Sequence, residues 1–453
     1  MNIDRIKNVY LIGVGGIGMS GLARYFHHLG YLVSGYDKTE TILTSELIAE
    51  GIGIVFEDSE NIIPSIFIEN VDETLVIYTP AVPKDSKIVQ AFKHSGHILH
   101  KRSEVLGFIS SSKFTIAIAG THGKTTTSTL VAHILQDSGF DCSAFLGGIS
   151  INYDSNVLFS SSNIMVVEAD EFDRSFLTLH PDIAVVTSMD ADHLDIYGDH
   201  QHLIDSFRLF IGQVKDGGTR IVREGLDLPA TWYYDIDEGA DIYASNIRII
   251  EGDFYFDYHN GEDAIKDIQL GIPGRHNVGN AVAAIAAAKV CGVPDEAIKH
   301  ALARFKGIKR RFQYIVKNKR EIYIDDYAHH PKELEACFEA VKSIYPDHKL
   351  TVLFQPHLFS RTRDFIDDFA KVLSSDGIGK LILLPIYPAR EMPIDGVSSE
   401  WLLDKIELSD KVLLSPDGAL KYIKEERPEL ILTVGAGDID RLVKPIKEIL
   451  TND

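Results

Sequence analysis

Short apolar runs alternate with helical patterns along most of the chain. The runs typical of buried strands are residues 9–14, 31–36, 74–78, 115–119, 164–168, 183–188, 321–325, 349–354, 380–384 and 430–434. Strands that alternate with helices in this way predict parallel sheets with crossover helices. We therefore expect an α/β fold.

Two glycine-rich turns, at residues 13–18 and 120–123, each join a predicted strand to a helix and predict two separate nucleotide folds. The length of 453 residues suggests about three domains. We place them at residues 1–107, 108–310 and 311–453. The first and last are expected to be Rossmann-like. The central one is expected to resemble a P-loop ATPase with a mostly parallel sheet, and to include the β-rich stretch at 219–270.

The composition argues against some classes of binding partner. Asp and Glu number 66 against 45 Lys and Arg, a formal net charge of −21, which argues against nucleic-acid and membrane-surface binding. No signal peptide is visible, and no apolar run reaches the roughly 18–20 residues of a membrane span. The sparse cysteines favour a reducing cytosol. We expect a cytoplasmic protein.

The first glycine turn fits G-x-G-x-x-G, and Asp37 ends the next predicted strand. Its glycines would let the backbone approach a diphosphate at the helix N-terminus. The residues expected to bind this ligand are Gly15, Gly16, Ile17, Gly18 and Asp37. Two alternatives remain open: a dehydrogenase would use Asp37 on an adenosine ribose, and the glycines could serve only tight packing.

The second glycine turn is the strongest signal. The residues predicted to bind phosphate are Gly120, Thr121, His122, Gly123, Lys124, Thr125 and Thr126. Lys124 would neutralise the β- and γ-phosphate oxygens, and the Thr125 hydroxyl would face Mg²⁺. The turn departs from the general P-loop pattern because Ile118 stands where the first glycine is expected.

This variant, G-T-H-G-K-T-T-T, resembles the loop of the muramyl ligase and folylpolyglutamate synthase family. Further segments resemble muramyl ligase motifs in the same order: residues 168–171 (EADE), 190–195 (DADHLD), 274–281 (GRHNVGNA), 310–313 (RRFQ), 325–331 (DDYAHHP) and 354–363 (FQPHLFSRTR). The resemblance covers most of the chain.

The resemblance implies an enzyme of small-molecule substrates, as a monomer or weak homodimer. It implies ATP and Mg²⁺, with Thr125, Glu168 and His193 as metal ligands. It implies nucleotide contacts from His276, Asn277, Asn280, Arg311 and Asp326. It implies substrate contacts from Tyr327, His329, His330, Arg361 and Arg363, with Lys124, His193, Arg361 and Arg363 acting in catalysis. Other roles stay open: His193 could be structural, Asp170 could brace its loop, and His276 could cap its helix.

The implied reaction joins L-alanine to UDP-N-acetylmuramate through an acyl phosphate, with ADP and phosphate released, in peptidoglycan precursor synthesis. Phe207 stands where many muramyl ligases carry a carbamylated lysine, which favours the alanine-adding branch. The nearest alternative is a recycling ligase that attaches an intact murein peptide. Folylpolyglutamate synthesis would leave the first glycine turn unexplained. A further alternative, a non-catalytic nucleotide sensor, is disfavoured by four residues that catalysis requires, namely Lys124, Thr125, Glu168 and His193.

Overall fold

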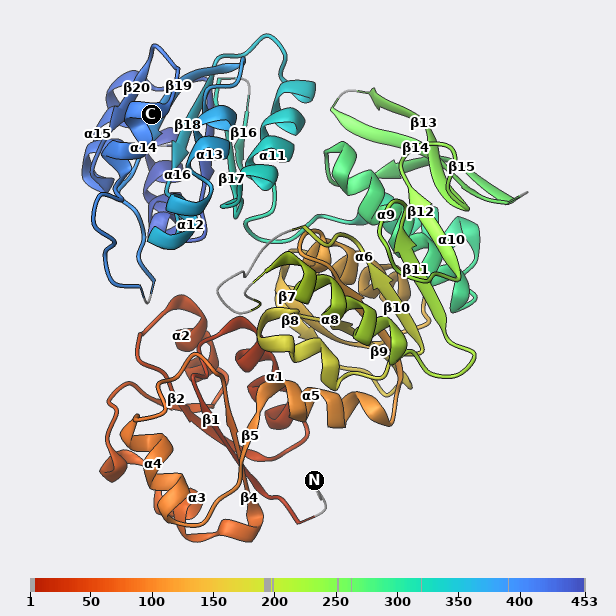
Figure 1. Ribbon diagram of the computed structural model, residues 1–453, viewed down its shortest axis with the longest axis vertical. Coiled ribbons are helices and arrows are strands. Elements are labelled where there is room, and N and C mark those ends of the chain that lie inside the picture. The colour runs from red at the N-terminus through yellow and green to blue at the C-terminus, as the bar shows by residue number, and fades with distance from the viewer. Residues whose placement is uncertain are drawn as a thin grey trace. The chain divides into compact units, whose positions relative to one another are not determined.

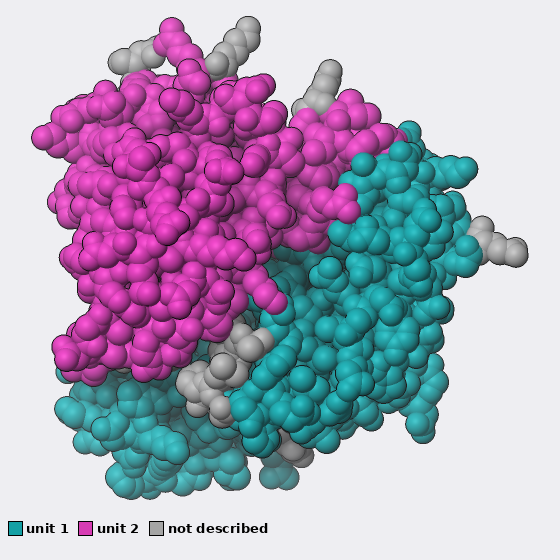
Figure 2. All heavy atoms as spheres, turned by 45° about the horizontal axis from the view of Figure 1, so that its top comes forward, with its two compact units in different colours: residues 1–247, 256–270, 278–305 teal, residues 248–255, 271–277, 306–453 magenta. Residues whose placement is uncertain are grey.

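Three sheets of five, ten and six strands organise the protein (Figure 1). The structure, a computed structural model, describes residues 5–190, 197, 199–250, 252–261, 263–318, 320–389 and 391–451. The chain forms two compact units (Figure 2). The first contains Met1–Ile247, Phe256–Leu270 and Val278–Phe305, and the second contains Arg248–Tyr255, Gly271–Asn277 and Lys306–Asp453. The prediction of an α/β fold with mostly parallel sheets is confirmed.

The five-stranded sheet has the order β3-β2-β1-β4-β5, with all strands parallel, as in a Rossmann-like fold. Its strands are β1 (Asn8–Ile12), β2 (Leu32–Tyr36), β3 (Gly53–Val55), β4 (Thr74–Tyr78) and β5 (Leu99–Lys101). Its α-helices are α1 (Ile17–His28), α2 (Ile42–Ala49), α3 (Ser65–Glu69), α4 (Lys87–His94) and α5 (Arg102–Ser111). The strand order reverses between β1 and β4, so the first glycine turn lies where such sheets bind ligands.

The ten-stranded sheet has the order β15-β14-β13-β12-β11-β10-β6-β9-β7-β8. The strands are β6 (Phe114–Ala119), β7 (Ser143–Ser150), β8 (Ser155–Leu158), β9 (Ile164–Glu168), β10 (Ile183–Val186), β11 (Thr219–Arg223), β12 (Trp232–Asp235), β13 (Ile242–Ile250), β14 (Asp253–Asn260) and β15 (Asp263–Leu270). The α-helices are α6 (Lys124–Asp137), α8 (His200–Gly212), α9 (Arg275–Val290) and α10 (Asp295–Arg304). The strands from β7 to β13 pair in parallel, and β8 is antiparallel to β7. Buried β6 therefore delivers the second glycine turn to the carboxyl edge of the sheet.

The six-stranded sheet has the order β16-β17-β21-β18-β19-β20, and only β16 pairs antiparallel among the strands described. The strands are β16 (Gln313–Lys317), β17 (Ile322–Asp326), β18 (Leu350–Phe354), β19 (Ile378–Leu383), β20 (Lys411–Leu413) and β21 (Leu430–Val434). The α-helices are α11 (Pro331–Ile344), α12 (Phe359–Asp364), α13 (Ile366–Leu373), α14 (Ser399–Lys405), α15 (Pro416–Glu426) and α16 (Val443–Thr451). Alternate residues of β18 and β21 enter two separate cores, one with α11, α13 and α14 and the other with α15 and α16. Helices on both faces explain why these strands are apolar throughout.

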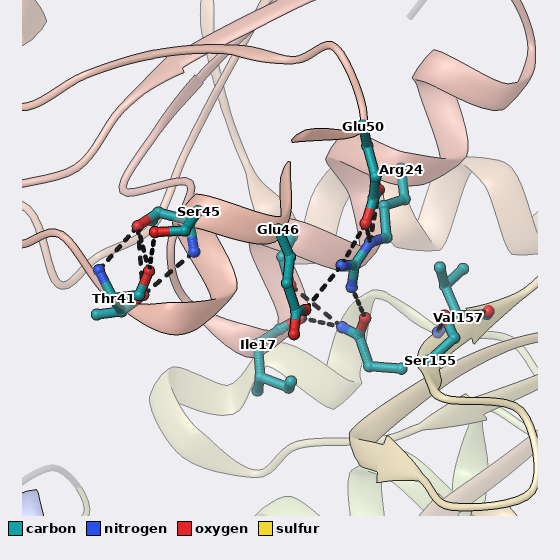
Figure 3. Close-up of polar contacts among 11 residues, drawn as sticks. Ile17, Arg24, Thr41, Ser45, Glu46, Glu50, Ser155 and Val157 are labelled. Carbon is teal, nitrogen blue, oxygen red and sulfur yellow. Dashed lines mark hydrogen bonds and ion pairs between the residues drawn. The ribbon is translucent and has the colours of Figure 1, made fainter. Parts of the chain in front are cut away.

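Within the first unit, α1 packs against the hairpin β7–β8. Asn156 of β8 is 1% exposed, and its side-chain amide donates to the Ile17 carbonyl at 2.6 Å and to the Ser20 hydroxyl at 3.2 Å. Its carbonyl accepts from Arg24 Nη1 at 2.8 Å, and Arg24 also pairs with Glu50 (Figure 3). These contacts fix the first turn of α1, directly after the glycine turn, to the ten-stranded sheet. Among the residues described, no helix is long and apolar enough to span a bilayer.

Candidate active site

The second glycine turn has a backbone that only glycine adopts readily. Gly120 and Gly123 have φ values of +135° and +83°, in the left-handed region. A Cβ at Gly120 would lie 2.1 Å from the Thr187 hydroxyl, and one at Gly123 would lie 2.6 Å from Asn280 Oδ1. The turn then opens α6 at Lys124. Backbone amides at such a helix N-terminus point toward an anion, as the phosphate-binding prediction requires.

The residues that follow β10 hold this turn in place. The amide of His122 donates to the Ser188 hydroxyl at 2.8 Å, and the amide of Thr187 donates to the Ala119 carbonyl at 3.0 Å. The amide of Asp190 donates to the Thr121 hydroxyl at 3.0 Å. The sequence predicts Thr187 and Ser188 as the end of a strand and indicates no role in the site for either residue. The available signal was a polar pair that ends an otherwise apolar run.

The positive charge of Lys124 is balanced by a buried carboxylate. Its Nζ lies 2.8 and 2.9 Å from the two carboxylate oxygens of Glu171 and donates to the Gly120 carbonyl at 2.6 Å. The Glu171 side chain is 1% exposed. Burial lowers the pKa of Lys124, but the carboxylates of Glu171, Asp170 and Glu168 outweigh it and raise that pKa above its usual value. Lys124 is therefore a fixed cation, and Glu171 is its counter-ion in this structure.

Glu168 ends β9 beside Ile118 of β6, so its carboxylate reaches the same edge as the second glycine turn. A Cβ at Gly147 of β7 would lie 2.1 Å from Glu168 Oε2, so this glycine keeps open the space that the carboxylate fills. Thr125, which carries a hydroxyl group, is also buried, in the first turn of α6. An acidic carboxylate and a hydroxyl match the oxygen ligands that Mg²⁺ prefers, with phosphate and water completing its shell.

The predicted ligand His193 and its neighbour Asp192 lie outside the described residues. Within the described ranges, no group of three or more His, Cys, Asp or Glu side chains could hold a metal ion unaided. The assignment of Thr125, Glu168 and His193 as metal ligands therefore remains a prediction. Phe207, the position compared with the family's lysine, lies in α8 and packs edge-on against Phe176 at 5.2 Å.

The predicted adenine-binding residues fall in different units. Asn280 belongs to the first unit, and its Oδ1 accepts from the Thr127 hydroxyl at 3.3 Å, beside Gly123. Asn277 belongs to the second unit, where its side-chain amide donates to the Pro273 carbonyl at 2.5 Å. His276 is exposed in the same unit. The structure thus places Asn280 against the second glycine turn, and an adenine contact from these three residues remains a prediction.

The first glycine turn is closed by Asp37. The amide of Gly15 donates to Asp37 Oδ2 at 2.8 Å, and that of Thr39 donates to Oδ1 at 3.1 Å. Gly13, with φ of +88°, makes the bend out of β1. Gly16, Ile17 and Gly18 then lead into α1. The five predicted residues of this site lie together, and Asp37 serves as a brace of the turn.

In the second unit, the carboxylate of Asp326 at the end of β17 accepts from the amides of Phe312 at 2.6 Å and Ala328 at 2.7 Å. It is 8% exposed, and burial raises its pKa to about 6 despite the nearby Arg311. The guanidinium groups of Arg310 and Arg311 lie over the Tyr327 ring, with their Cζ atoms 5.2 and 5.3 Å from its centroid. The predicted residues Arg311, Asp326 and Tyr327 therefore form one cluster.

His357 also belongs to this cluster, through His329, although its motif alone predicts no role for it. Its ring lies 5.7 Å from that of His329, and its Nδ1 accepts from Arg361 Nη1 at 3.4 Å. Burial, His329 and Arg361 lower the pKa of His357 to about 3, so it is neutral at pH 7. Burial also lowers the pKa of His329. A neutral imidazole here can accept a hydrogen bond beside the Arg361 cation.

The remaining predicted residues of the second unit face elsewhere. Arg363 is half-exposed and pairs with Asp364 at 2.7 Å, whereas Arg361 is 9% exposed. His330 caps the N-terminus of α11, and its ring packs edge-on against Phe365 at 4.8 Å. Of the two arginines, only Arg361 lies in the cluster with His329 and His357.

The raised pKa of Asp326 gives a testable pH dependence. Its folded value of about 6 exceeds the ordinary 3.8, so the native state binds more protons between these values and loses stability as pH rises through them. Asp326→Asn removes this loss. Its unfolding free energy relative to the native chain should therefore rise by about 1.5 kcal/mol from pH 5 to pH 8. Urea titrations followed by circular dichroism measure this, with the exposed Asp395→Asn as control, and a constant difference would contradict the assignment.

Three family models match most of the chain. Residues 8–114 match the Mur ligase family catalytic domain, residues 118–288 the Mur ligase middle domain, and residues 310–437 the Mur ligase glutamate ligase domain. These ranges contain the first glycine turn, the second glycine turn with Glu168, and the Asp326–Arg361 cluster, respectively. Each predicted site thus lies in a separate matched domain.

Individual proteins are similar over the full length. A UDP-N-acetylmuramate–L-alanine ligase of Flavobacterium psychrophilum is 51% identical over 451 residues, covering 99% of each chain. The solved UDP-N-acetylmuramate–alanine ligase of Thermotoga maritima shares the fold with a TM-score of 0.83 and 24% identity, over 97% of this chain and 98% of that one. A murein peptide ligase of Psychrobacter arcticus has a TM-score of 0.68 and 23% identity, over 99% of each chain.

Proposed function

The chain belongs to the Mur ligase family, and from that membership we propose that it joins L-alanine to UDP-N-acetylmuramate with ATP as the second substrate. The observation that carries the proposal is the full-length 51% identity to a UDP-N-acetylmuramate–L-alanine ligase. The product would be an alanyl amide of the sugar nucleotide, a precursor of peptidoglycan, released with ADP and phosphate. The site chemistry of both units supports this reaction.

The first step activates the lactyl carboxylate of the sugar nucleotide. A carboxylate oxygen attacks the γ-phosphorus of ATP, and the bond from that phosphorus to the β-phosphate oxygen breaks. This step releases ADP and forms an acyl phosphate. The second glycine turn holds the phosphates with its amides, and Lys124 offsets their charge. Thr125 and Glu168 would hold Mg²⁺, which neutralises phosphate charge during transfer. Asn280 Oδ1 lies so close to Gly123 that a side chain there would not fit, and it accepts from the Thr127 hydroxyl of α6.

The second step forms the amide. The amine of L-alanine attacks the acyl carbon, loses a proton, and phosphate departs. We assign the free carboxylate of L-alanine to Arg361, because it is the buried arginine of the pair and lies beside neutral His357. A fixed guanidinium suits a carboxylate. Arg363 and His330 are assigned no direct contact, since one pairs with Asp364 and the other caps α11.

The first glycine turn is assigned to the diphosphate of the sugar nucleotide, since its amides open α1 as such ligands require. We keep three functional domains, residues 1–107 for the sugar nucleotide, 108–310 for ATP and Mg²⁺, and 311–453 for the amino acid. Each of the ranges holds one of the three sheets. The three free cysteines favour a cytoplasmic enzyme.

Substrate choice tests the proposal directly. Purified chain with ATP and UDP-N-acetylmuramate should release phosphate with L-alanine, respond weakly to glycine or L-serine, and ignore D-glutamate. Glycine should be used about 10- to 100-fold less well, since one methyl in an apolar pocket contributes about 1–3 kcal/mol. Phosphate release and product mass measure this. A higher kcat/KM for L-alanyl-γ-D-glutamyl-diaminopimelate would instead identify a recycling ligase, and nucleotide binding without ADP release would identify a sensor.

A further inference from the structure

Arg102 lies on the first glycine turn, where the sequence motifs assign no residue. It follows β5 and begins α5, two strands along the sheet from β1. A Cβ at Gly18 would lie 2.7 Å from Arg102 Nη1 and 3.2 Å from its Cδ and Cζ. The guanidinium therefore covers the last glycine of the turn. A side chain at position 18 would thus displace the Arg102 guanidinium.

The charge of Arg102 is only loosely compensated. Its Nη2 lies 3.7 Å from Asp170 Oδ2, beyond hydrogen-bond distance, and both side chains are partly exposed. The other carboxylate oxygen of Asp170 accepts from the Phe172 amide at 3.0 Å. Arg24, on the same helix as Gly18, differs: it makes hydrogen bonds of 2.6–3.0 Å to Glu50 and one to Asn156. Arg24 is thus structural, whereas Arg102 can still bind an anion.

The position of Arg102 fits the reaction. On one side it touches the turn assigned to the sugar nucleotide, and on the other it faces Asp170, two residues after Glu168. The lactyl carboxylate must approach the γ-phosphate in this part of the first unit, and two anions repel each other. A planar, permanently charged guanidinium is the side chain best suited to reduce such repulsion and to bind either group.

We propose that Arg102 is a substrate-binding residue that contacts an anionic group of UDP-N-acetylmuramate, its diphosphate or its lactyl carboxylate. The inference rests on the proposed function. Asp170 is the counter-ion that the substrate replaces. Arg102 would thereby add a full positive charge to a turn whose glycines allow close approach of the ligand and whose amides donate hydrogen bonds to it.

Direct binding to the full chain tests the proposal. Calorimetric titration with UDP-N-acetylmuramate should show that Arg102→Ala weakens binding by at least about tenfold, with Arg102→Lys in between. Lys7→Ala is the matched control, because it removes one exposed positive charge just before the start of β1, whereas the glycine turn follows the end of that strand. This variant should bind UDP-N-acetylmuramate within about twofold of the native chain. The KM for ATP should stay unchanged in both Arg102 variants.

A second titration identifies the group. UDP-N-acetylglucosamine lacks the lactyl carboxylate, so equal weakening for both nucleotides assigns Arg102 to the diphosphate, and weakening for UDP-N-acetylmuramate alone assigns it to the carboxylate. Native-like binding of UDP-N-acetylmuramate by folded Arg102→Ala would overturn the inference while leaving the proposed function standing. A native chain that fails to bind UDP-N-acetylmuramate would overturn both.

Discussion

Lys124→Ala is expected to lower the ligation rate by at least about a hundredfold, because it removes a charge-assisted partner of the transferring phosphate, a contact of about 3 kcal/mol. The loss should appear mainly in kcat, since charge develops most during transfer. Phosphate release at saturating ATP, UDP-N-acetylmuramate and L-alanine measures it. Near-native turnover in a folded variant would rule out the assignment of this turn to phosphate.

The structure changes how that experiment must be controlled. A lysine in an exposed phosphate-binding loop could be removed without loss of stability. Lys124 instead pairs with Glu171, whose side chain is 1% exposed, and removing one partner of a buried pair commonly costs about 3–5 kcal/mol of stability. Lys124→Ala combined with Glu171→Gln avoids the uncompensated carboxylate. The double variant should regain thermal stability without regaining activity, and recovery of both would show that the single variant had failed only in folding.

Gly147→Ala is expected to reduce kcat by about a hundredfold through Glu168. The added methyl would lie 2.1 Å from one carboxylate oxygen and 2.4 Å from the other, so the carboxylate must move. A displaced metal ligand misplaces the charge stabilisation that phosphoryl transfer needs, an effect of about 10²- to 10³-fold for one lost stabilising contact. The Mg²⁺ concentration that gives half-maximal activity should rise in parallel. Activity titrated against Mg²⁺ checks both expectations.

The matched control for Gly147→Ala is Gly212→Ala. Gly212 ends α8 in the same unit, and an added Cβ there meets no atom within 4 Å. This variant adds the same methyl without touching the site and should keep native activity and Mg²⁺ dependence. If Gly147→Ala behaved like Gly212→Ala, Glu168 would not be the metal ligand.

Apolar periodicity predicts the main strands well because they are buried on both faces. Strands β4, β9 and β21 have the predicted bounds, and β1, β6 and β18 differ by one or two residues. The three-residue strands β3 and β5 escape prediction because their burial is only partial and their runs are too short for a period. The antiparallel strands β8 and β16 pair with their neighbours along the chain, β7 and β17, but β8 spans only four residues and β16 is mostly part-buried, so neither shows a clear apolar run.

The residues of the candidate site also differ in whether the sequence can predict them. The glycines and Lys124 can be predicted because a phosphate-binding turn needs them at fixed local spacing. Gly147, Asn156 and Arg102 could not, since each acts on a residue at least twenty positions away that only sheet order brings near. The arginines of α12 show a third limit: their spacing suggests a pair, but a helix turns Arg361 inward and Arg363 toward Asp364.

The Lys124–Glu171 pair makes nucleotide binding a competition between counter-ions. An incoming phosphate must match the contacts that Glu171 already gives before it gains any affinity. A single inorganic phosphate brings little beyond the charge it replaces, whereas ATP adds its other phosphates and its base. The site is thereby less prone to occupation by the phosphate that each turnover releases, and product inhibition by that ion should be weak.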